Sequence, residues 1–376
     1  MNNAKRLDTL DFFRLIAILS VMLFHYYSRW NPPESSTSLY PFGSKYNFFQ
    51  WGRYGVEFFF IISGFVITYT LHATKTVGDF WKRRFIRLFP AMVIASLITY
   101  LVMLLLDKDK LFIHGHSLLN FLVSITFLPP DLLNKIVAPL HVQSNYLSGS
   151  YWSLWPEIQF YFLASTIYFL NKRNFTRNFT LFSIGLFLLN LLMYGIDTNK
   201  LHIHIPGGAM ASYKFWLGSV FNLPFYMPWF LSGVLLHEVF FQKATKFIWG
   251  CLLVTAALGL CTCVLWLGHT AVIIYAGALL FFFLFIKYPG IFSHGIFRAL
   301  NKAGVASYFL YLIHENIGVL LINRYGGSFH GFSGLFPIMV IVALCLFSVW
   351  FYGAVEMPVS KYLKKIMFKE RKTLNQ

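Results

Sequence analysis

Long apolar runs follow one another along the chain from Leu10 almost to its end, with short polar or basic segments between them. Each run has about 20 residues, enough for a helix to cross a hydrocarbon core about 30 Å thick. The runs are continuously apolar, whereas strands of a membrane barrel alternate apolar and polar residues. The pattern predicts an all-α, polytopic integral membrane helical bundle of about ten transmembrane helices. The expected spans are 10–28, 54–73, 88–106, 151–170, 180–196, 215–237, 247–267, 270–287, 303–323 and 334–356.

No internal repeat and no Gly/Ser/Pro-rich linker divides the chain. We therefore expect residues 1–376 to form a single membrane domain with short N- and C-terminal tails. The stretch 117–130 is too short to span comfortably and ends in two prolines, so we expect it to be re-entrant or interfacial. The first span lacks a small-residue cleavage site, so we expect it to be retained and not removed as a signal peptide.

Composition and charge agree with a membrane protein. Only 12% of the residues are charged, whereas a soluble domain carries about 25%. The formal net charge of +17 comes from short basic clusters between apolar segments and not from one water-exposed face, so a nucleic-acid partner is not expected. Lys and Arg are retained on the cytoplasmic side, so the clusters predict both termini in the cytoplasm and residues 107–150 facing outward. We expect the membrane to be the plasma membrane.

The four cysteines lie inside apolar segments, where a free cysteine behaves as a small hydrophobic residue. Their spacing matches no metal-binding pattern and no histidine cluster accompanies them. Neither a disulfide framework nor a metal site is expected.

The ionisable residues Arg14 and His25 lie inside the first span. Such residues are costly within a bilayer, so each is a candidate functional residue. Arg14 lies near the expected cytoplasmic end and His25 near the outer end, about 16 Å apart along a helix. Histidine is suited to take and return a proton near neutral pH, so His25 is a candidate general base. A histidine that only hydrogen-bonds a neighbouring helix is an equally good interpretation of this span alone.

Two other spans carry carboxylates near their outer ends. Glu57 lies at the outer boundary, where we expect it to be solvated, either as an interfacial anchor or as a substrate contact. Glu157 is expected at a depth similar to His25, where it can orient the imidazole or bind a sugar hydroxyl. Trp152 belongs either to an interfacial aromatic belt or to a surface on which a sugar stacks.

Polar residues also occur deeper in two spans. His314, followed by Glu315, lies about mid-membrane, as a substrate contact or as part of a structural polar pair. Ser63 and Gly64 indicate a close contact between helices, because small residues let backbones approach.

Basic residues gather just before the third span, at Arg83, Arg84 and Arg87. In a helix Arg84 and Arg87 share a face. Guanidinium groups so placed can bind phosphates, as a nucleotide-bearing acyl donor such as coenzyme A requires. An anchor that binds the headgroups of membrane lipids explains the charge but not the spacing.

These motifs, taken in order, resemble those of the acyltransferase 3 family of integral membrane O-acyltransferases, which modify carbohydrates. The family's opening pattern, a basic residue, LDxLR, an apolar run and then FH, is matched by Arg6, Asp11, Arg14 and His25. Further motifs match at 55–65, 83–90, 152–161, 307–314 and 356–358. Glu57 replaces the usual Asp, and Pro156, Ile158 and Glu315 depart from the family pattern near the expected acceptor pocket.

The resemblance implies that acetyl-CoA or another acyl-CoA is the donor, bound from the cytoplasm by the arginines, with Arg14 lining the passage for its pantetheine arm. The acceptor would be an extracytoplasmic or lipid-linked carbohydrate. His25 would act as general base with Glu157 orienting it, or form an acyl-histidine intermediate, and this chemistry needs no metal. Some relatives carry an appended hydrolase-like domain that completes the transfer. The sequence shows no such domain, so we expect this chain to act alone or to pass its acyl group to a partner protein.

Two other classes of protein remain open on the residues alone. In a glycan or lipid-linked saccharide transporter or flippase, the intramembrane charges would line a path. In an inactive accessory protein, the fold would persist without chemistry. The ordered motifs and the retention of Arg14, His25, Arg84, Arg87 and Glu157 favour the enzyme.

Overall fold

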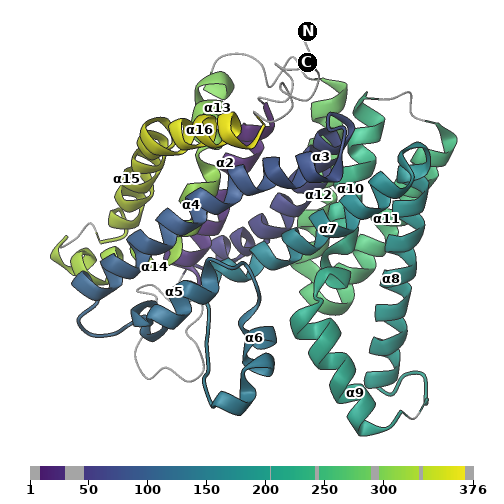
Figure 1. Cartoon of the computed structure of the whole chain (residues 1–376), viewed down its shortest axis with the longest axis horizontal. Helices are drawn as coiled ribbons and strands as arrows, with labels where there is room; N and C mark the ends of the chain where they lie inside the picture. The colour runs from purple at the N-terminus through teal and green to yellow at the C-terminus, as the bar shows by residue number, and fades with distance from the viewer. Residues whose placement is uncertain are drawn as a thin grey trace.

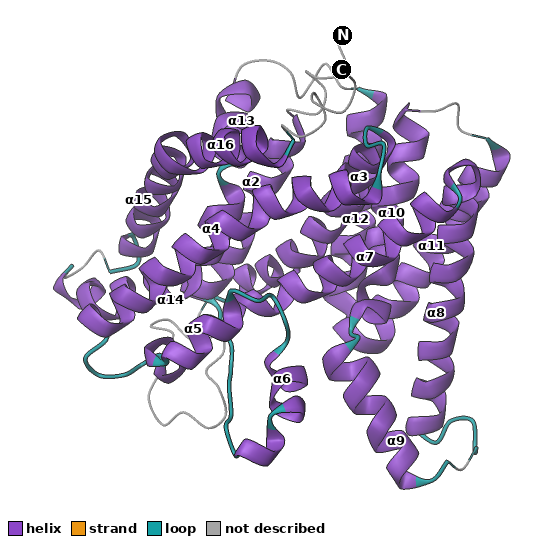
Figure 2. Cartoon of the chain, viewed as in Figure 1, coloured by secondary structure: helices purple, strands orange, loops and turns teal. Residues whose placement is uncertain are grey.

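The computed structural model describes residues 9–29, 46–203, 205–241, 245–288, 296–329 and 333–368. This part of the chain is almost entirely helical and contains no β-strand (Figure 2), which confirms the all-α class. Its α-helices are α2 (Thr9–Tyr27), α3 (Gly55–His72), α4 (Val77–Leu106), α5 (Leu118–Ser124), α6 (Pro130–Ile136), α7 (Leu154–Leu170), α8 (Phe175–Asp197), α9 (Gly207–Tyr213), α10 (Leu223–Phe241), α11 (Lys246–Thr262), α12 (His269–Lys287), α13 (Ile296–Val305), α14 (Ser307–Tyr325), α15 (Phe336–Phe351) and α16 (Met357–Met367). Short 3-10 helices η1 (Asn47–Tyr54) and η4 (Gly149–Ser153) lead directly into α3 and α7.

Each expected span overlaps a helix of the structure. Among the described residues, however, only seven helical stretches are long and apolar enough to cross a membrane. The bent pair Gly207–Val220 and Leu223–Phe241 makes an eighth if it is counted as one span. The expected membrane protein is supported, whereas the count of about ten spans is not confirmed.

The two expected spans that fall short are α7 and α14. Helix α7 has 17 residues, and α14 carries His314, Glu315 and Asn316 in its middle. Most side chains of α14 are buried against other helices. A helix that is surrounded by protein does not have to be apolar. The hydropathy of α14 is therefore low because it carries polar groups of the bundle interior.

The outer helices present apolar side chains to their surroundings. Leu188 on α8, Leu253 on α11, Leu280 on α12 and Leu346 on α15 are all exposed. Leucines in such positions suit a lipid environment and not water. The stretch 117–130 contains only the seven-residue helix α5 and the turn that leads to α6, which agrees with a segment too short to span.

Helices α3 and α10 run side by side through the centre of the bundle (Figure 1). A Cβ atom at Gly64 would overlap the carbonyl oxygen of Phe230, and one at Gly233 would overlap that of Ile61. The close helix contact expected at Gly64 is therefore confirmed. Helix α2 packs on α3, α13 and α14, so these helices together frame the polar interior.

The bundle has two ends that position the site. At one end α2 begins beside α13, since the backbone of Asp11 lies against Gly304. At the same end α4 begins beside α16, where Lys82 donates a hydrogen bond to the Met367 carbonyl. We call this the Arg84 end, and α13 and α16 lie together there in Figure 1. The opposite end, where α2 ends and α3 begins, is the His25 end. Arg6 and the expected tails 1–8 and 369–376 lie outside the described residues.

Candidate active site

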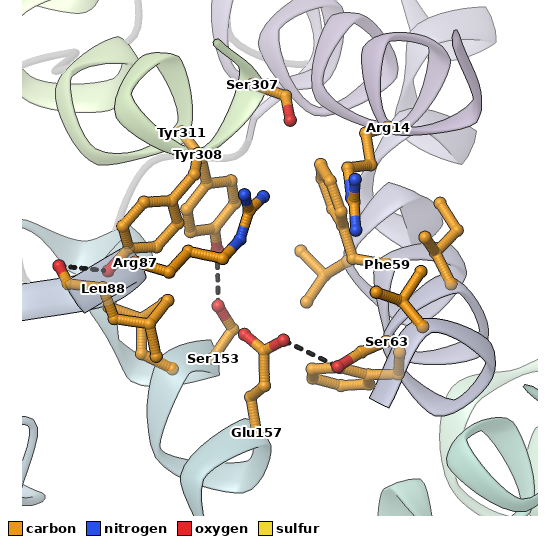
Figure 3. Close-up of a pocket in the computed structure, with 15 residues that line it drawn as sticks. Arg14, Phe59, Ser63, Arg87, Leu88, Ser153, Glu157, Ser307, Tyr308 and Tyr311 are labelled. Carbon is orange, nitrogen blue, oxygen red and sulfur yellow. Dashed lines mark hydrogen bonds between the residues drawn. The ribbon is translucent and has the colours of Figure 1, made fainter. Parts of the chain in front are cut away.

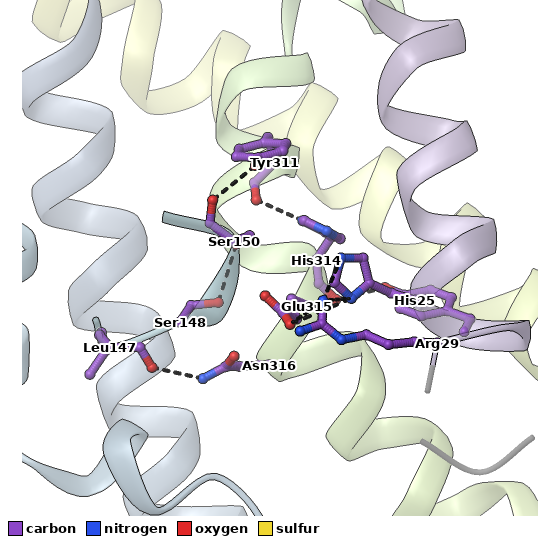
Figure 4. Close-up of polar contacts among 10 residues, drawn as sticks. His25, Arg29, Leu147, Ser148, Ser150, Tyr311, His314, Glu315 and Asn316 are labelled. Carbon is purple, nitrogen blue, oxygen red and sulfur yellow. Dashed lines mark hydrogen bonds and ion pairs between the residues drawn. The ribbon is translucent and has the colours of Figure 1, made fainter. Parts of the chain in front are cut away.

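The last turn of α2 places His25 in a buried polar cluster with Arg29 and Glu315 (Figure 4). The Arg29 Nη1 atom lies 3.2 Å from His25 Nδ1 and 3.2 Å from Glu315 Oε1. The same Glu315 oxygen lies 3.5 Å from His25 Nδ1. His25 and Glu315 are 5% and 2% exposed, so the Arg29 guanidinium compensates a carboxylate that bulk water hardly reaches. Both side chains are thereby held in one orientation.

His314 lies next to His25, with ring centroids 5.1 Å apart. Its Nδ1 atom lies 2.7 Å from the Tyr311 carbonyl oxygen, which assigns the ring proton to Nδ1. Nε2 is then a proton acceptor, and it is buried without a hydrogen-bond partner among the described residues. His314 therefore lies beside the candidate base, as a polar neighbour of His25 within the bundle.

Backbone contacts hold this cluster in place (Figure 4). A Cβ atom at Gly149 would lie 3.1 Å from both carboxylate oxygens of Glu315. The Asn316 side chain donates a 3.0 Å hydrogen bond to the Leu147 carbonyl. The segment that enters α7 is thus fixed against α14 at the level of His25.

A cavity of about 350 Å³ lies next to His25. Trp152, Tyr226 and Trp266 form part of its wall, and the rings of Trp152 and Tyr226 are 5.6 Å apart. Glu57 also lines it, with one carboxylate oxygen buried and without a hydrogen-bond partner among the described residues. The wall combines aromatic faces with polar groups, as in sites that bind small polar molecules.

Glu57 differs from the expectation that it is solvated, because it is only 6% exposed. The 3-10 helix η1 immediately precedes α3 and packs on α2, so it covers the first turn of α3. The hydropathy pattern placed the membrane boundary at Glu57, whereas the fold places protein over it.

Glu157 does not contact His25, which corrects the expected pairing of these two residues. It accepts a 2.7 Å hydrogen bond from Ser63 near the centre of the bundle (Figure 3). It also accepts one of 2.5 Å from Tyr161. The reason is that the chain reaches the level of His25 before α7 begins, since Gly149 in η4 already lies beside Glu315. Glu157 follows eight residues later, about 12 Å further along a helix at 1.5 Å per residue.

Arg14 and Arg87 line a central cavity of about 80 Å³ together with Glu157 (Figure 3). Arg14 forms an ion pair with Asp11 on the same helix. Arg87 makes no hydrogen bond with any described residue. A guanidinium that lines a cavity without an acceptor is suited to bind an anionic or carbonyl group.

A second cavity of about 350 Å³ lies at the Arg84 end. Arg83, Arg84 and Arg87 from α4 line it, together with Lys361 and Lys364 from α16. The three arginines predicted to bind a donor are therefore gathered on one cavity, and α16 adds two cations that the sequence motifs did not indicate.

The arginines differ in how the protein holds them. Arg84 donates a 3.3 Å hydrogen bond to Thr70, while its Nε is buried without a partner among the described residues. Arg83 is exposed, with its guanidinium 5.4 Å from the centre of the Phe368 ring. Arg84 and Arg87 thus point to the interior and Arg83 to the rim.

The three cavities follow one another through the bundle. Arg87 lines both the cavity at the Arg84 end and the central cavity. Val56 lines both the central cavity and the cavity next to His25. The arginine cluster and His25 therefore lie at opposite ends of one series of cavities.

Some of these residues were missed by sequence reasoning. Arg29 was not singled out, because it lies beyond the expected span and two residues after the end of α2, yet its guanidinium turns back to the imidazole of His25. Glu315 was noted as a neighbour of His314 and as a departure from the family pattern. Its pairing with α2 has no local signal, because the two segments lie 290 residues apart in the sequence. Ser63 was interpreted as a packing residue, yet its hydroxyl also donates to Glu157.

Comparisons with known proteins find acyltransferase relatives of this chain. A family model described as an acyltransferase domain matches residues 7–355. A Bacillus subtilis protein named as a candidate peptidoglycan O-acetyltransferase is 24% identical over 385 residues, which cover 93% of this chain and 54% of that protein. The O-acetyl transferase of Shigella phage Sf6 is 29% identical over 166 residues, 41% of this chain and 44% of that protein. No solved structure matches the chain significantly.

A Staphylococcus aureus protein named as a candidate O-acetyltransferase is 25% identical over 212 residues, 53% of this chain and 32% of that protein. The matches thus span about a third to about half of the length of these relatives. The described residues form a helical bundle with apolar outer faces and buried ionisable residues, which is the class of an integral membrane protein with a polar interior. Because the family model covers nearly the whole chain, the chain belongs to the acyltransferase 3 family.

Proposed function

We propose that this protein moves an acetyl group from acetyl-CoA, bound at the Arg84 end, to a hydroxyl of an extracytoplasmic or lipid-linked carbohydrate at the His25 end. The observation that carries the proposal is the series of three cavities between the arginine cluster and His25, in which neighbouring cavities share a lining residue. The names of the relatives favour acetyl as the acyl group and oxygen as its acceptor atom.

The cavity at the Arg84 end suits the donor. Five cations line it, and Glu356 is the acidic residue in its wall. Coenzyme A carries several phosphate charges, for which guanidinium groups provide bidentate hydrogen bonds. Arg84 and Arg87 would hold the phosphates, and Arg83 would attract the donor at the rim.

The narrow central cavity suits a thin, flexible chain such as the pantetheine arm. Arg14, Arg87 and Glu157 supply polar contacts for its amide groups. This arrangement would carry the thioester toward His25 without opening a wide aqueous path through the membrane.

His25 would take the proton from the acceptor hydroxyl, and that oxygen would attack the thioester carbonyl carbon. The carbon–sulfur bond then breaks, and the coenzyme A thiolate recovers the proton from His25. Glu315 stabilises the protonated imidazole, in the role that the sequence analysis gave to Glu157. An acyl-histidine intermediate uses the same residues, with the acetyl group resting on the imidazole between two transfers.

The cavity next to His25 suits a carbohydrate acceptor. Trp152, Tyr226 and Trp266 offer aromatic faces, and Glu57 offers an acceptor oxygen for a hydroxyl donor. Membrane lipids would surround the bundle and deliver a lipid-linked glycan to this end. A partner protein would complete the transfer if the glycan cannot enter the cavity next to His25.

The test is transfer by purified protein in lipid vesicles with labelled acetyl-CoA supplied on one side and glycan on the other. We expect label in alkali-labile ester linkage to the glycan when the donor is on the side of the Arg84 end. Movement of unmodified glycan without ester formation would instead support the transporter or flippase alternative.

A further inference from the structure

Three potential metal ligands converge at the Arg84 end, away from the residues assigned to acyl transfer. His72 is the last residue of α3, and His237 and Glu238 lie near the end of α10. His72 Nε2 and His237 Nδ1 each lie 3.3 Å from Glu238 Oε1. The three ligand atoms all lie within 4.8 Å of one another.

The buried carboxylate of Glu238 needs a positive charge next to it. Glu238 and His237 are 2% and 3% exposed. Among the described residues, no Lys or Arg pairs with Glu238, and its partners are the two imidazoles. A buried carboxylate is costly unless a positive charge compensates it. Either a proton on a histidine or a metal ion between the three groups would supply that charge.

The donor set and its geometry favour a metal. Two histidines and one carboxylate are a common set of ligands for Zn²⁺, with bonds of about 2.0–2.1 Å. Tetrahedral ligands at that bond length lie roughly 3.3 Å apart, which is the separation of both imidazole nitrogens from the Glu238 oxygen. The third separation, between His72 Nε2 and His237 Nδ1, is at most 4.8 Å, and the two rings lie 5.5 Å apart and nearly parallel, so a rotation of the His72 side chain would close the site around an ion.

The surroundings hold His237 in place and leave His72 accessible. His237 packs against Phe65 and Phe241, with ring centroids 5.3 and 4.7 Å away. The His72 side chain is 36% exposed, so an ion and a fourth, water ligand can reach the site from the solvent side.

We propose that His72, His237 and Glu238 bind one divalent transition metal ion, with Zn²⁺ preferred, which ties the end of α3 to the end of α10. Thr70 and Ala73, on either side of His72 in sequence, line the cavity that we assign to the donor. The ion would thus stiffen one wall of that cavity. It has no part in the proton transfer at His25, at the opposite end of the bundle.

Metal analysis of the full-length protein tests this proposal. The protein would be purified with an affinity tag that contains no histidines, stripped with a chelator, and titrated with Zn²⁺ or with Co²⁺ as a coloured probe. We expect binding of about one equivalent, absorption typical of tetrahedral Co²⁺, and a higher unfolding temperature on metal addition. An ion pair without a metal would show none of the three, and this outcome would overturn the proposal.

Variants locate the site. Glu238→Gln keeps the volume of the side chain and should weaken Zn²⁺ binding at least about tenfold, as should His237→Gln. His269→Ala removes an exposed histidine from the start of α12 and is the matched control, for which we expect unchanged binding. Equal loss in the control, or full binding in a folded Glu238→Gln protein, would refute the assignment. If the variants do not fold, the Co²⁺ spectrum of the unmodified protein still tests the proposal, because the absence of tetrahedral absorption would overturn it.

Discussion

The Glu315 carboxylate is shared between two partners, since one of its oxygens lies 3.5 Å from His25 Nδ1 and 3.2 Å from Arg29 Nη1. Glu315→Gln keeps the size of the side chain and removes its charge, so His25 loses a group that stabilises its protonated form. We expect the rate of acetyl transfer to fall at least about tenfold. This loss is smaller than the loss of about 10²–10⁴-fold expected when the general base itself is removed. Steady-state rates across pH would measure it, and the pH profile should change.

The matched control is Glu157→Gln, because Glu157 contacts Ser63 and Tyr161 and not His25. This variant should keep the pH profile of the unmodified protein, even if its rate falls. If both variants kept that profile, the assignment of Glu315 to His25 would be wrong.

Arg87 and Arg83 provide a second comparison, because one reaches into two cavities and the other lies exposed at the rim. Arg87→Ala removes charge-assisted hydrogen bonds worth about 1.5–3 kcal/mol, so acetyl-CoA should bind roughly 10- to 150-fold more weakly. Arg83→Ala should change affinity much less. Isothermal titration with acetyl-CoA would measure both, and equal affinities in folded proteins would make Arg87 a topological anchor instead.

At the scale of residues, sequence reasoning found the ionisable groups but not all of their partners. Arg14 and His25 stand out because charges are rare in apolar runs, and the α4 arginines stand out because they gather just before one. The pairing of His25 with Glu315 depends on how α14 packs against α2, and the position of Glu157 depends on the 3-10 helix before α7. Neither contact leaves a local pattern in the sequence.

At the scale of helices, the parallel contact of α3 and α10 depends on two glycines. A Cβ atom at Gly233 would overlap the Ile61 carbonyl, so Gly233→Ala forces the helices apart and should destabilise the fold by about 1–3 kcal/mol. Thermal unfolding in detergent would measure it. Gly250→Ala on α11 is the control, because a Cβ there meets nothing within 4 Å, and it should be neutral or stabilising by about 0.5–1 kcal/mol. Equal stability of the two variants would argue against a tight α3–α10 contact.

Hydropathy predicted where helices occur, since each expected span overlaps one, but it did not settle how many cross the membrane. The uncertain cases are α7, which has only 17 residues, and α14, whose polar residues face other helices instead of lipid. The cost of a polar residue depends on its neighbours in the fold, which a one-dimensional pattern does not contain.

At the scale of the whole molecule, the proposed direction of transfer requires the Arg84 end to face the cytoplasm. In a protein without its native cysteines, Leu140→Cys places a thiol on an exposed residue of the segment 107–150, and Lys172→Cys places one on the exposed turn after α7. An impermeant thiol reagent should label Leu140→Cys in intact cells, and Lys172→Cys only after permeabilisation. The reverse pattern would invert the topology and place the donor site outside.

The central claim is that His25 performs acyl transfer at the opposite end of the cavity series from the donor's phosphates. The most direct measurement is acetyl transfer and acetyl-CoA affinity for His25→Ala in the same folded preparation. The account predicts a rate about 10²–10⁴-fold lower, because the general base is lost, with donor affinity close to that of the unmodified protein. Near-normal acetylation by folded His25→Ala protein would contradict it and leave His25 as a structural partner of Arg29 and Glu315.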